Sequence, residues 1–293
     1  MAWTTTDGSS GRALSSASRV TALIELLRPV NGFLAAAAVL VGAFVSRSPT
    51  FWWPAFAGAA SAFAAAGAAN ALNDRLDSVS DSINRPGRPI PSGRLSQAAA
   101  TTAACVGGLA SVGLAAVIGP RAVALALIWL VLTALYSRVL KGVPLAGNIA
   151  VALVASTPFL MGGFSQGKYL LAVIPCALAF FVHLAREIVK DVEDIAGDEA
   201  AGVRTFAVRR GASAAFAVAR GVLVVLIGLA ALPFAFRVYG WGYASVLVVI
   251  DAVLVWLLVS METNSGGRGL RRPSNALKAV MALGLLAFIV GVL

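Results

Sequence analysis

Nine runs of mostly apolar residues, each about as long as a membrane-spanning helix, constrain the fold of this sequence more than any other feature. A helix needs about 20 apolar residues to cross the hydrocarbon core of a bilayer. Only 12% of the residues are charged, whereas soluble domains carry about 25%, so these runs cannot all be covered by a water-facing surface. The sequence therefore predicts an all-α, polytopic membrane protein with nine transmembrane helices in one bundle. The predicted spans are residues 30–47, 53–73, 98–118, 121–137, 144–163, 169–187, 212–236, 239–260 and 275–293.

The residues before the first span divide into two parts. Residues 1–18 are polar and lack the apolar region of a secretory signal, so they are expected to form a flexible cytoplasmic tail. Residues 19–293 are expected to form one transmembrane domain. At its start, four apolar residues at positions i, i+3, i+4 and i+7 predict an amphipathic helix that rests in the membrane interface. These four residues are Val20, Leu23, Ile24 and Leu27.

The basic residues are distributed unequally between the two sides of the predicted bundle. Nineteen of the 23 lysines and arginines fall on one side, and the other four are Arg47, Arg121, Lys168 and Arg237. Positive charge is concentrated on the cytoplasmic side of membrane proteins. We therefore expect a multi-pass protein of the cell membrane. The net charge of +10 is then a topological signal, and no nucleic-acid partner is expected.

Nine of the thirteen acidic residues form two clusters, each at the predicted cytoplasmic end of a span. The spacing D-x-x-D-x-x-x-D occurs in both clusters, displaced by 117 residues. Four predicted spans separate the clusters, and an even number returns the chain to the same side. This arrangement predicts two parallel four-helix repeats. The repeated aspartates are Asp74, Asp77 and Asp81 in the first motif and Asp191, Asp194 and Asp198 in the second.

The spacing of the aspartates also predicts what they bind. If each helix continues past the membrane, the three carboxylates of a motif lie on one face. Like charges at these spacings destabilise a helix, whereas Mg²⁺ binds carboxylate oxygens and takes its remaining ligands from water and substrate phosphates. Two solvated, topology-setting loops would be the alternative, but the matched spacing and sidedness favour a metal site.

A proline-rich basic segment, Asn84–Arg94, follows the first motif directly. Its three prolines end the helix and hold an extended chain. This chain is expected to present Arg85 and Arg88 near the carboxylates, and guanidinium groups bind phosphate oxygens bidentately. The segment therefore predicts a diphosphate site. A secondary transporter remains the alternative from another class, but transporters place ionisable residues near the midplane, often within inverted repeats.

At these residues the chain resembles the UbiA superfamily of intramembrane prenyltransferases. Asn73–Asp81 matches the family's NDxxDxxxD motif, and Asp191–Asp198 matches its second aspartate-rich motif. Tyr136–Lys141, followed by Pro144 and Gly147-Asn148, is similar to the family's Tyr/Lys loop. The resemblance covers essentially the whole chain after Ser18. Residues 78–80, Ser-Val-Ser, depart from the bulkier residues common in the first motif and are expected to face away from the metal.

The resemblance implies two Mg²⁺ ions that bridge a prenyl diphosphate to the two motifs. One ion would be bound by Asn73, Asp77 and Asp81, and the other by Asp191 and Asp198. Asp74 and Asp194 are the candidates for accepting the acceptor's proton, and Tyr136 and Lys141 are further candidate catalytic residues. The candidates for binding the diphosphate or an acceptor phosphate are Arg28, Asn31, Arg85, Arg88, Lys141 and Lys190.

Three stretches, residues 27–31, 84–93 and 186–205, are most similar to family members of archaeal ether-lipid synthesis. Those members move a geranylgeranyl group from its diphosphate onto the free hydroxyl of geranylgeranylglyceryl phosphate. The resemblance therefore implies geranylgeranyl diphosphate as donor and a lipid-like acceptor at the cytoplasmic side of the membrane. Other members use 4-hydroxybenzoate and related quinone precursors, haem or chlorophyll, and these acceptors remain alternatives. Structural roles are expected for His183 and for Asp251 in the eighth span.

Overall fold

The computed structural model describes residues 16–46, 52–263 and 271–293, and these ranges contain helices but no strand. The predicted all-α class is confirmed. Of the predicted tail, residues 1–15 lie outside the described residues, and Ser16–Ser18 belong to the first helix. The longer helices are α2 (Pro29–Val45), α3 (Trp53–Leu76), α5 (Gln97–Ala116), α6 (Pro120–Arg138), α9 (Val173–Glu193), α11 (Phe206–Ala235), α12 (Trp241–Thr263) and α13 (Arg271–Val292). The shorter elements are α1 (Ser16–Leu27), α4 (Ser78–Asn84), the 3₁₀ turn η1 (Leu140–Gly142), α7 (Ala146–Ser156), α8 (Pro158–Ser165) and α10 (Ile195–Ala200).

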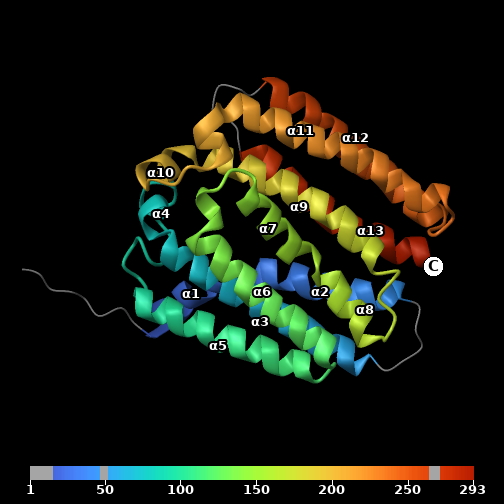
Figure 1. The fold of residues 1–293 in the computed structure, drawn as a ribbon, viewed down its shortest axis with the longest axis horizontal. Helices are drawn as coiled ribbons and strands as arrows, with labels where there is room; N and C mark the ends of the chain where they lie inside the picture. Colours follow the sequence, from blue (N-terminus) through green and yellow to red (C-terminus); the bar gives the residue numbers. More distant parts are fainter. Residues whose placement is uncertain (1–15, 47–51, 264–270) are drawn as a thin grey trace, which may run out of the picture.

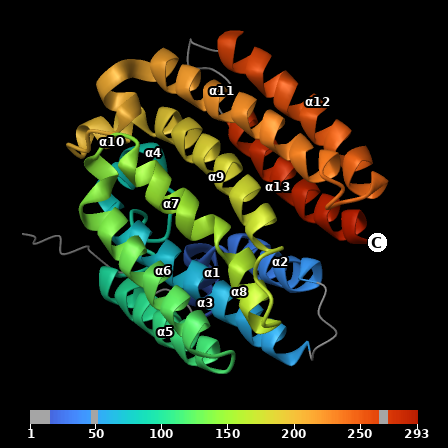
Figure 2. The same cartoon turned by 45° about the vertical axis from the view of Figure 1, so that its right-hand side comes forward.

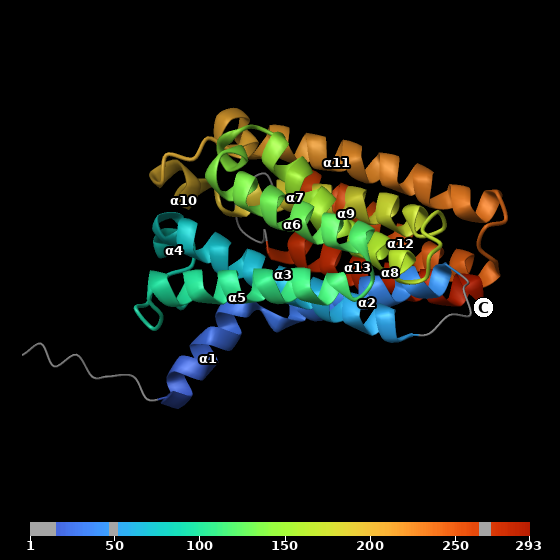
Figure 3. The same cartoon turned by 60° about the horizontal axis from the view of Figure 1, so that its bottom comes forward.

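The long helices lie side by side in a layered bundle (Figure 1). Helices α3, α5 and α6 form one outer side and α11 and α12 form the other, with α2, α7, α8, α9 and α13 between them (Figures 1 and 2). The short helices α4 and α10 pack against each other at one end of the bundle, and the C-terminus lies at the opposite end (Figure 3).

Within the described ranges, seven helical segments are long and apolar enough to cross a membrane: α3, α5, α6, the continuous pair α7–α8, α11, α12 and α13. The pair α1–α2, bent by 44°, is an eighth candidate. Large apolar side chains project outward from the bundle, including Leu109 of α5, Val131 of α6 and Val248 of α12, which are 76%, 63% and 70% exposed. Such a surface suits contact with lipid tails, and the protein is an integral membrane protein.

Prolines and small residues determine where these helices start and how closely they pack. Helices α2, α3, α6 and α8 each have proline in their first turn, where the missing N–H is not needed. Gly42 of α2 faces the backbone of Phe159, and Gly162 of α8 faces the backbone of Val39. Because a Cβ at either glycine would collide with that backbone, the two glycines permit the close approach of α2 and α8.

Helix α1 ends where the chain turns sharply into the bundle. Arg28 has left-handed backbone angles (φ 49°, ψ 67°) directly before Pro29, a conformation that L-residues adopt at a cost of about 1–2 kcal/mol. The apolar stripe predicted for the interface is present: Val20 and Ile24 are 57% and 52% exposed, while Ala22 and Leu26 are buried. The bend allows α1 to present this stripe outside the bundle.

Both aspartate motifs lie at breaks between helices, and not on continuous helices as the spacing predicted. Helix α3 ends before Asp77 and α9 ends before Asp194, and each of these aspartates precedes a short helix. Their backbone angles are nearly the same, φ −89°, ψ 8° and φ −101°, ψ 2°. The break turns α4 and α10 toward each other, which a straight extension of α3 and α9 would not do.

Candidate functional site

The two aspartate motifs are connected directly by side chains of α4. Asn84 donates to the carbonyl oxygen of Asp194 at 3.0 Å and accepts from the backbone N–H of Gly197 at 3.0 Å. The hydroxyl of Ser80 donates to the carboxylate of Asp198 at 3.0 Å. Ser80 is buried, so the expectation that it faces away from the site is wrong. The first motif therefore reaches the second through residues that lie between its aspartates and after them.

Three arginines neutralise the aspartates from the outer side. Arg28 pairs with Asp74, and Arg88 pairs with both Asp74 and Asp81. Arg85 lies 2.7 Å from Asp194 and 3.8 Å from Asp81, so its guanidinium bridges the two motifs. The proline-rich segment thus places its arginines beside the carboxylates, as the sequence predicted.

Lys141 lies between the middle aspartate of the first motif and the last aspartate of the second. Its ammonium nitrogen is 2.7 Å from Asp77 and 3.6 Å from Asp198. The lysine belongs to η1, which follows α6, so a third part of the chain contributes to the site. One cation therefore reaches both motifs at once, and the two carboxylates are close enough to share a ligand.

The first residues of the two motifs are held by polar side chains of neighbouring helices. Ser137 donates to the side-chain oxygen of Asn73 at 3.0 Å, and Asn148 donates to Asp191 at 2.9 Å. Asn148 is positioned by the loop after Lys141, in which Leu145 has left-handed backbone angles (φ 63°, ψ −29°). Non-glycine residues in this region concentrate at functional sites. Arg28 and Leu145 are two such residues, and both flank the aspartates.

Burial raises the pKa of two carboxyl groups at the site. Desolvation raises the pKa of Asp81 above its ordinary value, although Arg88 opposes the shift. Burial likewise raises the pKa of Asp198 against the opposing charge of Lys141. Among the described residues, the ion pairs of the six motif aspartates involve four basic side chains, namely Arg28, Arg85, Arg88 and Lys141. The site therefore has an excess of buried negative charge, which further cations would stabilise.

The donor atoms of the site fit Mg²⁺. Carboxylate and amide oxygens, which the motif residues supply, are its preferred protein ligands. Within the described part of the chain, no three acidic side chains converge on one point, because Asp74, Asp77, Asp81, Asp194 and Asp198 are each directed toward an arginine or lysine. The oxygen atoms are therefore present at the meeting point of the motifs, in contact with cationic side chains.

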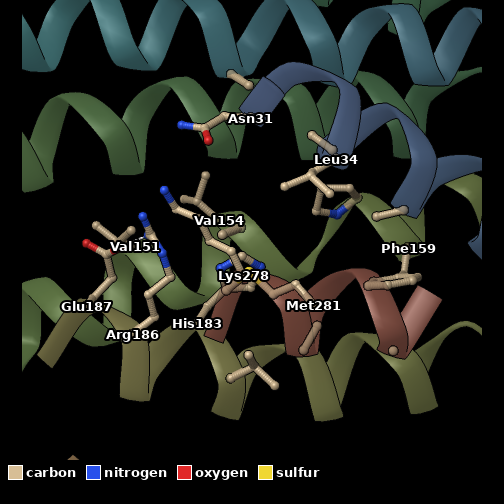
Figure 4. Close-up of a pocket in the computed structure, with 18 of the residues that line it drawn as sticks. Asn31, Leu34, Val151, Val154, Phe159, His183, Arg186, Glu187, Lys278 and Met281 are labelled. Atoms are coloured by element: carbon tan, nitrogen blue, oxygen red, sulfur yellow. Dashed lines mark hydrogen bonds and ion pairs between the residues drawn. The ribbon is translucent and has the colours of Figure 1, made fainter. Parts of the chain in front are cut away.

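An apolar cavity of about 320 Å³ reaches the first motif, since Asn73 is one of its lining residues. Figure 4 shows part of this lining. Leu34 of α2, Val154 of α7 and Phe159 of α8 form one part of its wall, and His183 of α9 and Met281 of α13 form another, so the helices in the middle of the bundle enclose it. Asn31, Tyr136 and Lys190 line this cavity and form no ion pair with the aspartates among the described residues. Lys190 instead lies 3.7 Å from Glu187.

A second, polar pocket of about 400 Å³ lies on the outer side of the aspartates. It is lined by Arg28, Arg85, Arg88 and Asp74, together with the proline-rich segment. Arg28 lines the apolar cavity as well, so the two spaces meet at this residue. A molecule with an anionic head and an apolar tail would fit here, with its head in the polar pocket and its tail in the apolar cavity.

The sequence did not identify several residues that organise the site. Ser80, Asn84, Ser137 and Asn148 hold the aspartates or connect the motifs. Asn84 and Asn148 lie within stretches that the family resemblance covers, which was the available signal for them. Ser137 and Ser80 lie within such stretches too, but their partners are 64 and 118 residues away, so the local spacing gave no indication of these contacts.

The chain is similar to known proteins over nearly its whole length. The model of the UbiA prenyltransferase family matches residues 35–272. A digeranylgeranylglyceryl phosphate synthase of Methanopyrus kandleri is 38% identical over 272 residues, which cover 93% of this chain and 99% of that relative. Another, of Natronomonas pharaonis, is 39% identical over 280 residues, with coverage of 93% and 97%.

Solved structures agree with the fold. A structure described as a digeranylgeranylglyceryl phosphate synthase in membranes superposes with a TM-score of 0.74 at 25% identity, covering 94% of this chain and 98% of that one. A UbiA homologue from Archaeoglobus fulgidus bound to GPP and Mg²⁺ also gives 0.74, at 21% identity, with coverage of 92% and 99%. The second likeness shows the fold alone.

Proposed function

The chain belongs to the UbiA prenyltransferase family, and from this premise we propose that it transfers a geranylgeranyl group from geranylgeranyl diphosphate to the free hydroxyl of geranylgeranylglyceryl phosphate. The relatives that share 38% and 39% identity are named for this activity. The observation that carries the proposal is the convergence of both aspartate motifs on Lys141, at 2.7 Å and 3.6 Å. Because the two motifs lie close enough to share one cation, metal ions bound by each motif would lie close enough to share one diphosphate.

The chain's own residues would divide the work of the reaction. Arg85 and Arg88 would exchange their carboxylate partners for diphosphate oxygens, since guanidinium groups bind both. The prenyl chain would lie in the apolar cavity, between Leu34 and Val154, where water cannot quench a positive allylic carbon. The C1–O bond to the diphosphate breaks, and the acceptor oxygen bonds to C1. The acceptor's proton passes to a carboxylate, for which Asp74 and Asp194 are the candidates.

Two Mg²⁺ ions are part of the proposal. Asn73, Asp77 and Asp81 would hold one ion, and Asp191 and Asp198 would hold the other. Bound there, the ions would stabilise the negative charge that develops on the departing diphosphate. The solved neighbour with GPP and Mg²⁺ supports such chemistry within this fold.

We further place the protein in the cell membrane with nine crossings. The ninth would be α9, whose first half is apolar and whose last turns carry five charged residues of the second motif region. The uneven distribution of basic residues supports a cytoplasmic position for the aspartate end. The matching breaks at Asp77 and Asp194 support two parallel repeats, each with a long helix that leads into a short one.

The test is prenyl transfer by the purified protein in membranes, with radiolabelled geranylgeranyl diphosphate. We expect product with geranylgeranylglyceryl phosphate, and none with 4-hydroxybenzoate or haem. Removal of Mg²⁺ with EDTA should abolish transfer, and added Mg²⁺ should restore it. Asp77→Ala and Asp198→Ala should each abolish transfer while the protein remains folded. Transfer only to an aromatic acceptor would replace the proposed acceptor, and full activity of either aspartate variant would overturn the metal assignment.

A further inference from the structure

The apolar cavity carries an excess of positive charge that the diphosphate site does not use. Of the charged residues that line it, four are basic and one, Glu187, is acidic. Arg28 among these is paired with Asp74, and Arg186 and Lys190 lie close to Glu187. Unpaired cations beside apolar walls are unfavourable, so the excess of basic over acidic residues in the lining suits an anionic ligand.

Arg186 and Lys278 are the two lining cations that have a donor group without a partner among the described residues. Arg186 of α9 bonds Glu187 through one terminal nitrogen at 2.7 Å, while its Nε is buried without a hydrogen-bond partner in the described structure. Lys278 of α13 forms no ion pair with any described residue and is exposed to the cavity. Figure 4 shows both side chains projecting from their helices into the cavity, with Arg186 beside Glu187. The buried Nε and the unpaired ammonium group can therefore both donate to an anionic ligand.

We propose that Arg186 and Lys278 bind the phosphate of the acceptor, at a site separate from the diphosphate site; this inference rests on the proposed function. A phosphate monoester carries a charge of about −1.5 to −2 at neutral pH, which complements the excess of basic over acidic residues in the lining. It also offers three acceptor oxygens for guanidinium and ammonium donors. A phosphorylated, lipid-like alcohol would therefore accept hydrogen bonds from Arg186 and Lys278, whereas a neutral acceptor would leave these donors unpaired.

The position of the two residues suits the reaction. Arg186 precedes Asp191 by five residues on α9, which corresponds to about 7.5 Å along a helix axis. The hydroxyl and the phosphate of a glyceryl phosphate ether share one glycerol unit, so a phosphate held at this depth keeps the hydroxyl near the aspartates. Beyond Lys278, α13 lines the cavity with Met281, Leu285 and Phe288. This wall would hold the acceptor's own apolar chain, opposite the wall assigned to the donor.

The decisive measurement compares a phosphorylated and a non-phosphorylated acceptor. Wild-type protein is assayed with geranylgeranylglyceryl phosphate and with geranylgeranylglycerol, and KM and kcat are determined for each and for the donor. Arg186→Gln and Lys278→Gln should each raise KM for the phosphorylated acceptor by about tenfold or more, the value of one charge-assisted hydrogen bond. The donor's KM and transfer to geranylgeranylglycerol should change less than about twofold. Lys278→Arg should retain the preference for the phosphorylated acceptor.

Controls separate this inference from the function on which it rests. Arg209→Gln removes an exposed arginine of α11 that lines neither pocket, and it should leave both acceptors unaffected. Lys278 has an exposed side chain, so its substitution tests binding without disturbing the core. If the wild type transfers the prenyl group but both Gln variants keep the full preference for the phosphate, the inference is wrong and the function stands. If the wild type uses neither acceptor, both fall.

Discussion

Lys141 connects the two aspartate motifs, and its removal provides a test at the scale of a single residue. Without its ammonium group, the buried carboxylates of Asp77 and Asp198 lose a shared partner, which is unfavourable for buried charges. We predict that Lys141→Met lowers the single-turnover rate of prenyl transfer at saturating Mg²⁺ by about 10²-fold, comparable to the loss of one transition-state donor.

The matched control for this prediction is Lys168→Met. Lys168 is exposed and lies just before α9, at the end opposite to the second motif. The same change in charge and shape there should leave the rate within twofold. A Lys141→Met protein that reacts as fast as this control would show that the ammonium group has no part in catalysis.

The sequence predicted which residues carry charge at the site, but not how they pair. The spacing correctly brought Arg85 and Arg88 to the carboxylates, because prolines restrict where that short segment can extend. Lys190 was grouped with them, yet it lies beside Glu187 and the cavity. Its direction depends on how α9 packs against its neighbours, which the local sequence does not encode. Arg186 and Lys278 were missed for the same reason, since they are 92 residues apart in the sequence and only the packing of α9 and α13 brings them to one cavity.

At the scale of elements, the contact between α4 and α10 determines whether the motifs meet. Gly197 of α10 permits this contact, because a Cβ at that position would lie 2.6 Å from the carbonyl oxygen of Ser80. We predict that Gly197→Ala separates the two short helices, destabilises the protein by about 1–3 kcal/mol as other overpacked contacts do, and lowers transfer activity. Thermal unfolding in detergent and the transfer assay measure the two effects.

The control is a second glycine-to-alanine substitution, which is expected not to destabilise the protein. Gly221 lies within α11, and nothing approaches the place where its Cβ would be. Because alanine favours a helix interior by about 1 kcal/mol over glycine, Gly221→Ala should preserve or raise Tm and leave activity unchanged. Equal behaviour of the two alanine variants would contradict the role assigned to Gly197.

The breaks at Asp77 and Asp194 show where element-level prediction failed. Carboxylates at i, i+3 and i+7 suit one face of a continuous helix, and nothing in the local sequence forbids such a helix. The helix ends instead at the middle aspartate of each motif. The bonds of Asn84 to Asp194 and Gly197 hold α4 against α10, across more than 100 residues. A long-range contact therefore overrides the local periodicity.

At the scale of the whole molecule, composition predicted the helices better than it predicted the arrangement of the site. Long apolar runs correspond to the long helices because length and hydrophobicity are local properties. The nine predicted spans exceed the eight candidates found among the described residues, of which the bent pair α1–α2 is one. The difference lies in α9, whose last turns carry the charges of the second motif region. The charged residues that are proposed to bind substrate and metal therefore weaken the signal for a membrane span.

The orientation of the whole bundle can be tested by the accessibility of single cysteines. Cys105 and Cys176 are replaced by alanine, and one new cysteine is introduced by Ser92→Cys or by Lys168→Cys, both at exposed positions. Moving the arginine-rich end through the bilayer would cost about 2.5–3.5 kcal/mol per charge at the membrane centre, so that end should remain cytoplasmic. A membrane-impermeant maleimide should label Lys168→Cys in right-side-out vesicles and Ser92→Cys in inverted ones. Labelling of Ser92→Cys from the outside would place the aspartates on the wrong side for a cytoplasmic prenyl diphosphate.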